Sequence, residues 1–321
     1  MDAGEIELFT DSVRRATERT SGTALDEALA ALGWTEALEA DRRRAVAVLF
    51  EAQGRANATS SALDQLLSAA LGLPDPDAAA VVLPSLRGTD APGHHDAAHL
   101  AVGGLGTPTL TRRDTAVVAA ASGGGGECFT VPVSALKLEP TRGLDPAFGL
   151  VEVSAHLDQR ALGEPTASDW STALAVGQLA LGHELVGAGR TMLELARRHA
   201  LERVQFGRPI ASFQAVRHRL AESFVALDAA DALLAAAWDE PEPDPTIAAM
   251  AKAFAGQSGR TVARHCQQVL AGIGFTTEHD LHRFVRRTIV LDQLLGASSV
   301  LTRRLGAEVL ATGSLPASLP L

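Results

Sequence analysis

Four side chains between Arg203 and Gln214 combine the chemistry that a dinucleotide requires with a turn that would present it. The stretch reads R-V-Q-F-G-R-P-I-A-S-F-Q and lies between two long helical patterns. The planar donors of an arginine can meet two pyrophosphate oxygens at once. A glutamine and an aromatic ring suit the amide edges and the face of a nucleotide. These side chains are Arg203, Gln205, Phe206 and Gln214, and a plain helical connection requires none of them.

The local sequence predicts that one helix ends here, the chain turns tightly and a second helix starts. Gly207 supplies a helix terminus, a position that a residue without Cβ adopts most easily. Pro209 is tolerated near a first helical turn, where one N–H has no partner anyway. Ser212 is then expected to be the N-cap of a helix through Leu220. The motif would therefore stand at the junction of two helices.

The longer stretch A-L-E-R-V-Q-F-G-R-P-I-A-S-F-Q-A-V-R-H-R-L resembles the signature of the acyl-CoA dehydrogenase family of flavoproteins. A second stretch, Q-V-L-A-G-I-G-F-T-T-E-H-D-L-H-R from Gln268 to Arg283, resembles the second flavin segment of that family. The two stand in the family's order and spacing. The resemblance implies residues that reach across a dimer interface to the FAD of the partner subunit. In this chain these are Arg203, Gln205, Phe206, Gln214, Gln268, Gly272 and Gly274, with Ala271 in place of the first glycine of the usual pair.

The resemblance also indicates where a catalytic base is missing. Desaturation of an acyl-CoA needs a carboxylate that takes the α-proton while the flavin takes the β-hydride, and the base must have a matched pKa. In the family this glutamate lies in a loop after the second flavin segment or on the first long helix of the C-terminal bundle. Leu295 and Gly177 occupy those two positions here, and Gln178 stands where many relatives have an arginine.

Three other acids or bases of the C-terminal half are candidates for the missing base. Glu184 follows His183 on the predicted first long helix, and a polar contact in the core or an interface is an open alternative to catalysis there. Glu278 corresponds to a glutamate that active relatives have beside their base, so it is interpreted as structural. A lone histidine in an apolar stripe, such as His183 or His199, is more often a hydrogen-bonded core residue.

The sequence predicts a mainly α protein with a small β domain. The expected domains are an N-terminal helical domain at 1–76, a trimmed middle β-barrel at 77–165 and an up-and-down bundle of four to five helices at 166–321. Helices are expected at Glu5–Arg19, Ala40–Gln53 and Ser60–Leu71. E-A-Q-G-R-A at Glu51–Ala56 resembles an E-x-x-G-R step of the family. No counterpart is found for the T-E-P…G-S-D segment that lies against flavin and acyl group in the family's barrel.

Composition excludes several classes of function. The net charge is −10 and no basic block is found, which argues against nucleic acid. No apolar run approaches the ~20 residues of a membrane span, and M-D-A-G-E-I-E-L lacks the apolar core of an export signal, so a cytoplasmic protein is expected. Cys128 and Cys266 are expected to be buried thiols. His94, His95, Asp96 and His99 are dense enough to suggest a metal, but a polar loop is the simpler interpretation and no metal is predicted.

The leading hypothesis is a subunit of an FAD-dependent acyl-CoA dehydrogenase that desaturates an acyl-CoA thioester. The chain resembles the short, degenerate actinobacterial members, some of which are the non-catalytic partner in sterol side-chain β-oxidation. It would complete the FAD site of a longer homologue in a heterodimer or α2β2 heterotetramer and lack its own base. The alternatives are a self-sufficient, homo-oligomeric dehydrogenase or oxidase with an unrecognised base, and a flavin-free scaffold or binding protein on the same fold.

Overall fold

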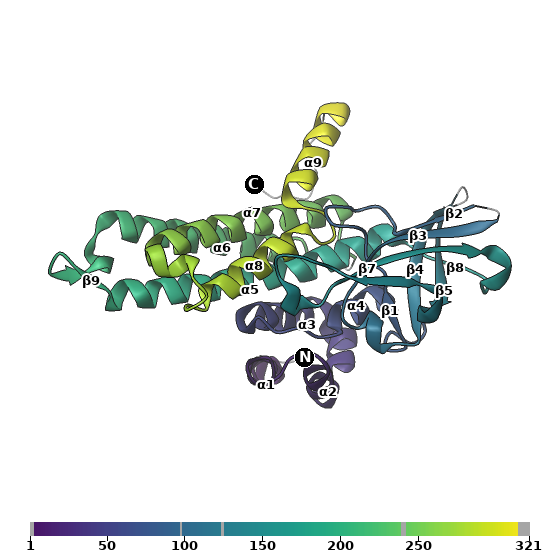
Figure 1. Ribbon diagram of the computed structural model, residues 1–321, viewed down its shortest axis with the longest axis horizontal. Helices are drawn as coiled ribbons and strands as arrows, with labels where there is room; N and C mark the ends of the chain where they lie inside the picture. Colours follow the sequence, from purple (N-terminus) through teal and green to yellow (C-terminus); the bar gives the residue numbers. More distant parts are fainter. Residues whose placement is uncertain (1–2, 97, 123–124, 239–241, 314–321) are drawn as a thin grey trace. The chain divides into compact units, whose positions relative to one another are not determined.

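The structure is a computed structural model that describes residues 3–96, 98–122, 125–238 and 242–313 (Figure 1). Helices hold 62% of the residues, and the remainder includes one modest sheet, which confirms the prediction of a mainly α protein with a small β domain. Contacts divide the chain into two compact units. The first comprises 1–58, 180–239 and 250–292, and the second comprises 59–179, 240–249 and 293–321. The three domain boundaries expected from the sequence stay a prediction.

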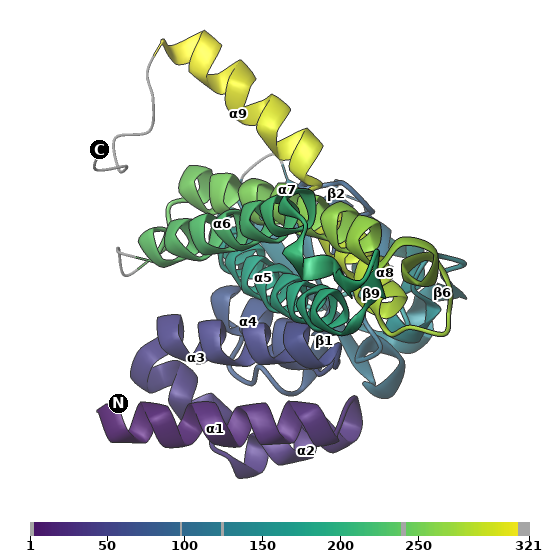
Figure 2. The same ribbon diagram turned by 90° about the vertical axis from the view of Figure 1, so that its left-hand side faces the viewer.

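The first unit is helical. Figure 2 shows α1 (Ala3–Arg19) beside α3 (Trp34–Ala56), with the short α2 (Thr23–Ala31) between them in the chain. Asp41 has non-helical backbone angles inside α3, so the part after it corresponds to the helix expected at Ala40–Gln53. The later part of α5 (Trp170–Glu202), α6 (Gln214–Ala236), most of α7 (Pro245–Leu270) and α8 (Leu281–Gln293) run side by side as a bundle (Figure 1).

Helix α5 is buried on every side between Ala180 and Gly189, rather than along the single stripe that its spacing predicts. A helix without a polar face belongs in the interior of a bundle. Its glycines allow this position because they let neighbouring helices approach. A Cβ on Gly54 of α3 would overlap the carbonyl oxygen of Glu184, and a Cβ on Gly187 would overlap that of Glu51. The E-x-x-G-R step therefore provides the close crossing of α3 and α5.

The charged residues of that step hold the same crossing from its edge. Glu51 accepts hydrogen bonds from Arg55 at 2.8 Å and from Arg190 of α5 at 2.6 Å. The other nitrogen of Arg190 donates to Asp231 of α6 at 2.8 Å. An arginine fork between two carboxylates fixes orientation as well as charge. These pairs therefore connect α3, α5 and α6 within the first unit.

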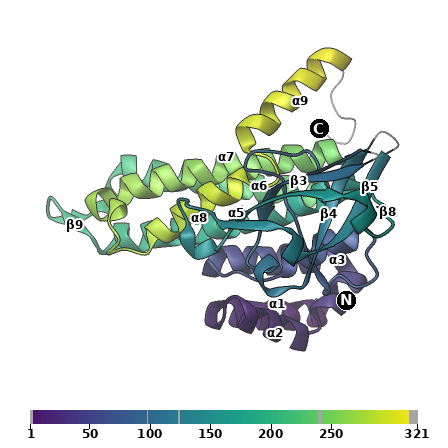
Figure 3. The ribbon, with the colours of Figure 1, turned by 45° about the vertical axis from the view of Figure 1, so that its right-hand side comes forward.

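The second unit contains the sheet, of which Figure 3 labels β3, β4, β5 and β8. The strand order is β6-β7-β3-β2-β4-β5-β8, and β1 pairs in parallel with β4. The longest ladders are antiparallel, between β3 and β7 and between β4 and β5. The bounds are β1 Ala79–Val81, β2 Gly93–His95, β3 His99–Gly106, β4 Thr115–Ser122, β5 Gly125–Pro132, β6 Lys137–Pro140, β7 Val151–Asp158 and β8 Thr166–Ala167.

One apolar cluster fills the inner face of this sheet. Phe129 and Val131 of β5 pack there with residues of β3, β4 and β7. Helix α4 (Ala62–Ala70) adds a buried carboxylate, because Asp64 accepts the Val81 N–H at 2.9 Å and the Thr107 hydroxyl at 2.6 Å. A buried charge needs such partners. The unit also contains the last helix, α9 (Ser298–Thr312).

None of the helices in the described part of the chain combines the length and the hydropathy that a membrane-spanning segment needs.

Candidate functional site

The turn between α5 and α6 is a β-hairpin rather than the plain helix junction that the sequence predicts. Strands β9 (Val204–Gln205) and β10 (Arg208–Pro209) pair antiparallel, with Phe206 and Gly207 as the two loop residues. Both loop residues have positive φ, 54° and 78°, as a tight two-residue hairpin requires. Gly207 therefore serves the hairpin and not a helix end, and Pro209 lies in a strand. Figure 1 shows the hairpin at one end of the bundle.

Ser212 does not cap α6, which corrects the sequence prediction. Its hydroxyl donates to the carbonyl of Pro209 at 2.7 Å, within a short 3-10 turn, η5 (Ile210–Ser212). The N-cap is Phe213, which has no side-chain capping bond. The helix starts one residue later than expected because the serine oxygen is engaged in the preceding turn.

The four predicted nucleotide contacts of the hairpin region are all exposed to solvent. Phe206 is 91% exposed, which is unusual for a phenylalanine. The Gln205 amide donates to the Val204 carbonyl at 2.7 Å, and the Gln214 amide lies 3.3 Å from Nε2 of His218. Among the described residues none forms an ion pair with the Arg203 guanidinium. The region thus presents a free cation, two amides and an aromatic ring outward.

The second predicted segment lies at the end of α7 and in the 3-10 helix η6 (Ala271–Phe275). Gln268 is exposed on the last turn of α7. Ala271, the residue in place of a glycine, has φ 51°, so it adopts the left-handed conformation that favours glycine. Gly272 has open space where a Cβ would stand, whereas a Cβ on Gly274 would come within 2.9 Å of Leu270. Gly272 is therefore accessible, and Gly274 is required for packing.

Both segments lie at the same end of the bundle. Ile210, Ala211 and Val216 pack on one apolar cluster that also contains Leu270 and Leu281. Burial, together with the positive groups of His279 and Arg203, lowers the pKa of His199. The two segments therefore form one exposed surface at this end of the bundle.

Gly177 and Leu295, the two positions at which the resemblance implies a glutamate, lie against one another within the second unit. A Cβ on Gly177 would lie 2.6 Å from a methyl carbon of Leu295 and 2.9 Å from one of Leu67. Leu295 is fully buried, and its carbonyl accepts a hydrogen bond from the Gln178 amide at 2.9 Å. The space in which either glutamate would lie is therefore filled by an apolar contact, which we call the Leu295 plug.

We expect Leu295→Glu to produce no dehydrogenase turnover in the isolated chain. The new carboxylate would be buried beside Gly177 and Leu67, so burial would raise its pKa and favour the neutral acid. Loss of the plug should also destabilise the fold by about 2–4 kcal/mol. Urea unfolding and an acyl-CoA assay of the purified variant test this. Robust turnover in the single variant would show that the pocket is intact.

The other candidate bases lie in structural environments. Glu184 is buried 3.9 Å from Arg287, which also donates to the Ala58 carbonyl at 3.2 Å. Burial raises the pKa of Glu184 to about 7, and Arg287 opposes that rise. His183 is buried, its Nε2 has no hydrogen-bond partner in the described chain, and burial lowers its pKa to about 4. Glu278 is exposed in the loop before α8.

As the pH rises, the titrations of neighbouring Glu184 and His183 should change the free energy of unfolding in opposite directions. Between pH 4.5 and 7 the folded state binds more protons at Glu184, so stability falls as pH rises. Between pH 4 and 6.5 the unfolded state binds more protons at His183, so stability rises with pH. The stability of Glu184→Gln relative to that of wild type should therefore increase as the pH rises from 4.5 to 7, by at most about 3 kcal/mol in total. Urea titrations at several pH values measure this, and a constant difference would contradict it.

The histidine-rich segment lies in the sheet. Nδ1 of His95 lies 2.6 Å from a Glu127 carboxylate oxygen, and its Nε2 lies 2.8 Å from Oε1 of the Gln159 side-chain amide. Asp96 accepts the backbone N–H groups of Ala98 and His99. In the described ranges no three His, Cys, Asp or Glu side chains are placed to share a metal ion. The His95 ring and the Asp96 carboxylate thus form hydrogen bonds within the sheet and its turn.

Sequence reasoning missed the loop that follows β1. It ends in Gly88-Thr89-Asp90, which differs from the G-S-D end of the family segment by one methyl group, and this was the available signal. The loop is fixed at Thr89, whose carbonyl accepts the Trp170 indole N–H at 2.9 Å. Its earlier part, Leu83-Pro84-Ser85, contains a proline but neither the threonine nor the glutamate of T-E-P.

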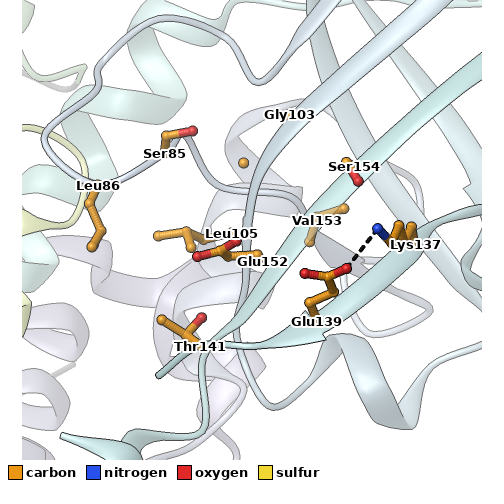
Figure 4. A pocket seen from close by; sticks show the side chains of 11 residues that line it. Ser85, Leu86, Gly103, Leu105, Lys137, Glu139, Thr141, Glu152, Val153 and Ser154 are labelled. Atoms are coloured by element: carbon orange, nitrogen blue, oxygen red, sulfur yellow. Dashed lines mark ion pairs between the residues drawn. The ribbon is translucent and has the colours of Figure 1, made fainter. Parts of the chain in front are cut away.

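Ser85 and Leu86 of this loop border a pocket of about 440 Å³ on the sheet (Figure 4). The charged side chains around it are Lys137, Glu139 and Glu152. Lys137 pairs with Glu139 at 2.7 Å, and Glu139 stands opposite Glu152 in the strand register. The lining therefore has one negative charge in excess, which opposes the binding of an anionic dinucleotide.

Comparison with known proteins agrees with the two sequence motifs. The model of the acyl-CoA dehydrogenase C-terminal domain matches residues 169–310. Acyl-CoA dehydrogenase IpdE2 of Mycobacterium tuberculosis is 36% identical over 171 residues, which are 53% of this chain and 51% of that protein. Acyl-CoA dehydrogenase FadE34 of the same organism is 39% identical over 132 residues, 40% of this chain and 19% of that one. The alignments thus span about half, or less, of these curated relatives.

Solved structures extend the likeness of fold to nearly the whole chain. A variant of the Tcur3481-Tcur3483 steroid ACAD gives a TM-score of 0.76 at 24% identity, covering 96% of each chain. The ChsE4-ChsE5 complex from Mycobacterium tuberculosis gives 0.73 at 19% identity, covering 99% of each chain. These values confirm the predicted fold.

Proposed function

The chain belongs to the acyl-CoA dehydrogenase family through residues 169–310, and on that premise we propose that it is the non-catalytic subunit of a hetero-oligomeric, FAD-dependent enzyme. It completes the FAD site of a longer homologue in a heterodimer or α2β2 heterotetramer. The carrying observation is the Leu295 plug, because it fills both positions from which a glutamate could reach a substrate. The assembled enzyme would desaturate an acyl-CoA thioester at its α and β carbons.

The residues at the end of the bundle support the donating role. The guanidinium of Arg203 would bind two pyrophosphate oxygens, and the ring of Phe206 would cover one face of the nucleotide. Gln205, Gln214 and Gln268 would supply amide donors and acceptors, and Gly272 would leave room for close approach. FAD, when bound, supplies the hydride acceptor of the reaction. This chain's part is to hold and orient it.

Exposed apolar side chains on the same unit support the proposal that a partner subunit binds there. Phe206, Phe224, Val225 and Phe275 are each more than half exposed. Large exposed apolar residues around an arginine are typical of an interface core. The similar solved structures named ChsE4-ChsE5 complex and steroid ACAD favour a steroid or other lipid acyl-CoA and a second subunit for this chain too.

Co-expression tests the proposal. The chain is purified alone and with each longer acyl-CoA dehydrogenase homologue of its organism. We expect a colourless chain alone and a yellow complex of defined mass with one partner, with turnover of an acyl-CoA in the complex. Flavin and turnover in the isolated chain would instead establish a self-sufficient enzyme. Absence of flavin in every combination would establish a scaffold or binding protein.

A further inference from the structure

The hairpin that carries Phe206 cannot be held by its own strands. Each strand has two residues, and such a ribbon is marginal by itself. Phe206 has φ 54°, which a bulky residue rarely adopts. Its ring is 91% exposed, so burial does not fix it either. Other contacts must determine where this ring points.

Arg208 and Phe213 supply those contacts. The guanidinium carbon of Arg208 lies 4.4 Å from the centroid of the Phe213 ring, which is a cation–π geometry. The Phe206 ring meets the same ring edge to face, at 6.0 Å and 80°. Arg208 is opposite Gln205 in the hairpin, and Phe213 is the half-buried N-cap of α6. Phe213 therefore connects the tip of the hairpin with the start of a helix.

The remaining bonds of the turn fix its backbone only. The Ile210 N–H donates to the Arg203 carbonyl at 2.8 Å, and the Ser212 hydroxyl donates to the Pro209 carbonyl at 2.7 Å. Neither bond touches the side chain at position 206. The direction of that ring thus depends on the stack of Arg208, Phe213 and Phe206.

We propose that Arg208 and Phe213 are positioning residues for the flavin contact, which hold Phe206 and the Arg203 end of the hairpin in the geometry that the partner's FAD meets. The inference rests on the proposed function, since it concerns the same surface. It adds two residues that the sequence motif did not assign to flavin. It also predicts that a positive charge over the Phe213 ring, and not the length of the side chain, is what matters at position 208.

Hydrogen exchange in the isolated chain tests the stack without a partner. Arg208→Gln keeps a long polar side chain but removes the charge, so the Ile210 amide should exchange about two- to fivefold faster. Arg208→Lys should restore most of the protection. Arg217→Gln is the matched control, because Arg217 is also exposed and lies on the next turn without a motif role. Equal exchange in all four proteins would overturn the proposal.

Flavin retention in the complex tests the second part of the proposal, that the stack positions the flavin contact. Arg208→Gln should lose flavin about two- to fivefold faster and change the visible circular dichroism of the bound flavin, while the unfolding midpoint stays at the wild-type value. Arg208→Lys should recover both readings. Wild-type retention in Arg208→Gln, beside a loss in Arg203→Ala, would overturn this inference and leave the proposed function standing. A wild-type complex that never binds flavin would overturn both.

Discussion

Arg203→Ala should leave the complex assembled but strip it of flavin. The side chain is exposed and has no ion pair within the described chain, so its removal costs the fold little. A charge-assisted contact to a pyrophosphate is worth about 1.5–3 kcal/mol. Its loss should weaken flavin binding about ten- to a hundredfold. The ratio of flavin to protein absorbance after gel filtration measures the effect, and excess FAD should restore the ratio.

Two further variants make this result specific. Arg203→Lys should rescue flavin only in part, because an ammonium keeps the charge and loses the planar fork. Arg197→Ala is the control, since Arg197 lies on α5, which ends just before Arg203, and already donates to Glu194 at 2.9 and 3.0 Å. Its flavin ratio should equal that of wild type. Identical ratios in all variants would mean that the motif is only a shared turn, and the scaffold alternative would then be preferred.

Gly54→Ala should unfold much of the first unit, although the change adds a single methyl group. The added Cβ would overlap the carbonyl oxygen of Glu184 and come within 2.8 Å of the Ala188 nitrogen. Both obstacles are backbone atoms of α5, which cannot rotate away. Helices α3 and α5 would have to separate, which should lower the free energy of unfolding by about 3 kcal/mol or more. Urea denaturation followed by far-UV circular dichroism measures this.

A second glycine provides the comparison. Gly306 is also helical, in α9, and has open space where its Cβ would stand. Gly306→Ala should therefore be neutral or stabilise by about 0.5–1 kcal/mol, because alanine loses less conformational entropy in a helix. Similar destabilisation in both variants would indicate that helix propensity matters here and that the close crossing does not.

Periodicity predicted α1 well because that helix carries its own pattern of apolar residues, whereas the short α2 was not predicted. Helix α1 starts within two residues of the expected Glu5 and ends at the expected Arg19. The hairpin was missed because its strands have two residues each, too few for any period to show. Ser212 was misassigned because a serine before a helix can bond either forward or backward, and only the backbone geometry decides between them.

The candidate site, too, could be predicted from the sequence only in part. The residue types of Arg203, Gln205 and Phe206 could be recognised in the sequence because they are contiguous. The contact between Leu295 and Gly177 could not, because Leu295 and the adjacent Gln178 are 117 residues apart in the chain. The Arg208–Phe213 stack was equally invisible, since the spacing of the two residues does not reveal that one lies over the ring of the other.

On the proposed function, the Leu295 plug makes the loss of a base hard to reverse in evolution. A glutamate at position 177 meets the methyl groups of Leu295 and Leu67. One at position 295 enters a fully buried position beside Gly177, on a residue whose φ is 54°. Each of these single substitutions therefore lowers the stability of the fold, and with it fitness, before any catalytic activity is gained. A return to catalysis would need coordinated substitutions in a helix and a distant loop. Once such a chain depends on a catalytic partner, the Leu295 plug prevents a simple return to independent catalysis. The dependence on the partner is then retained even without selection for it.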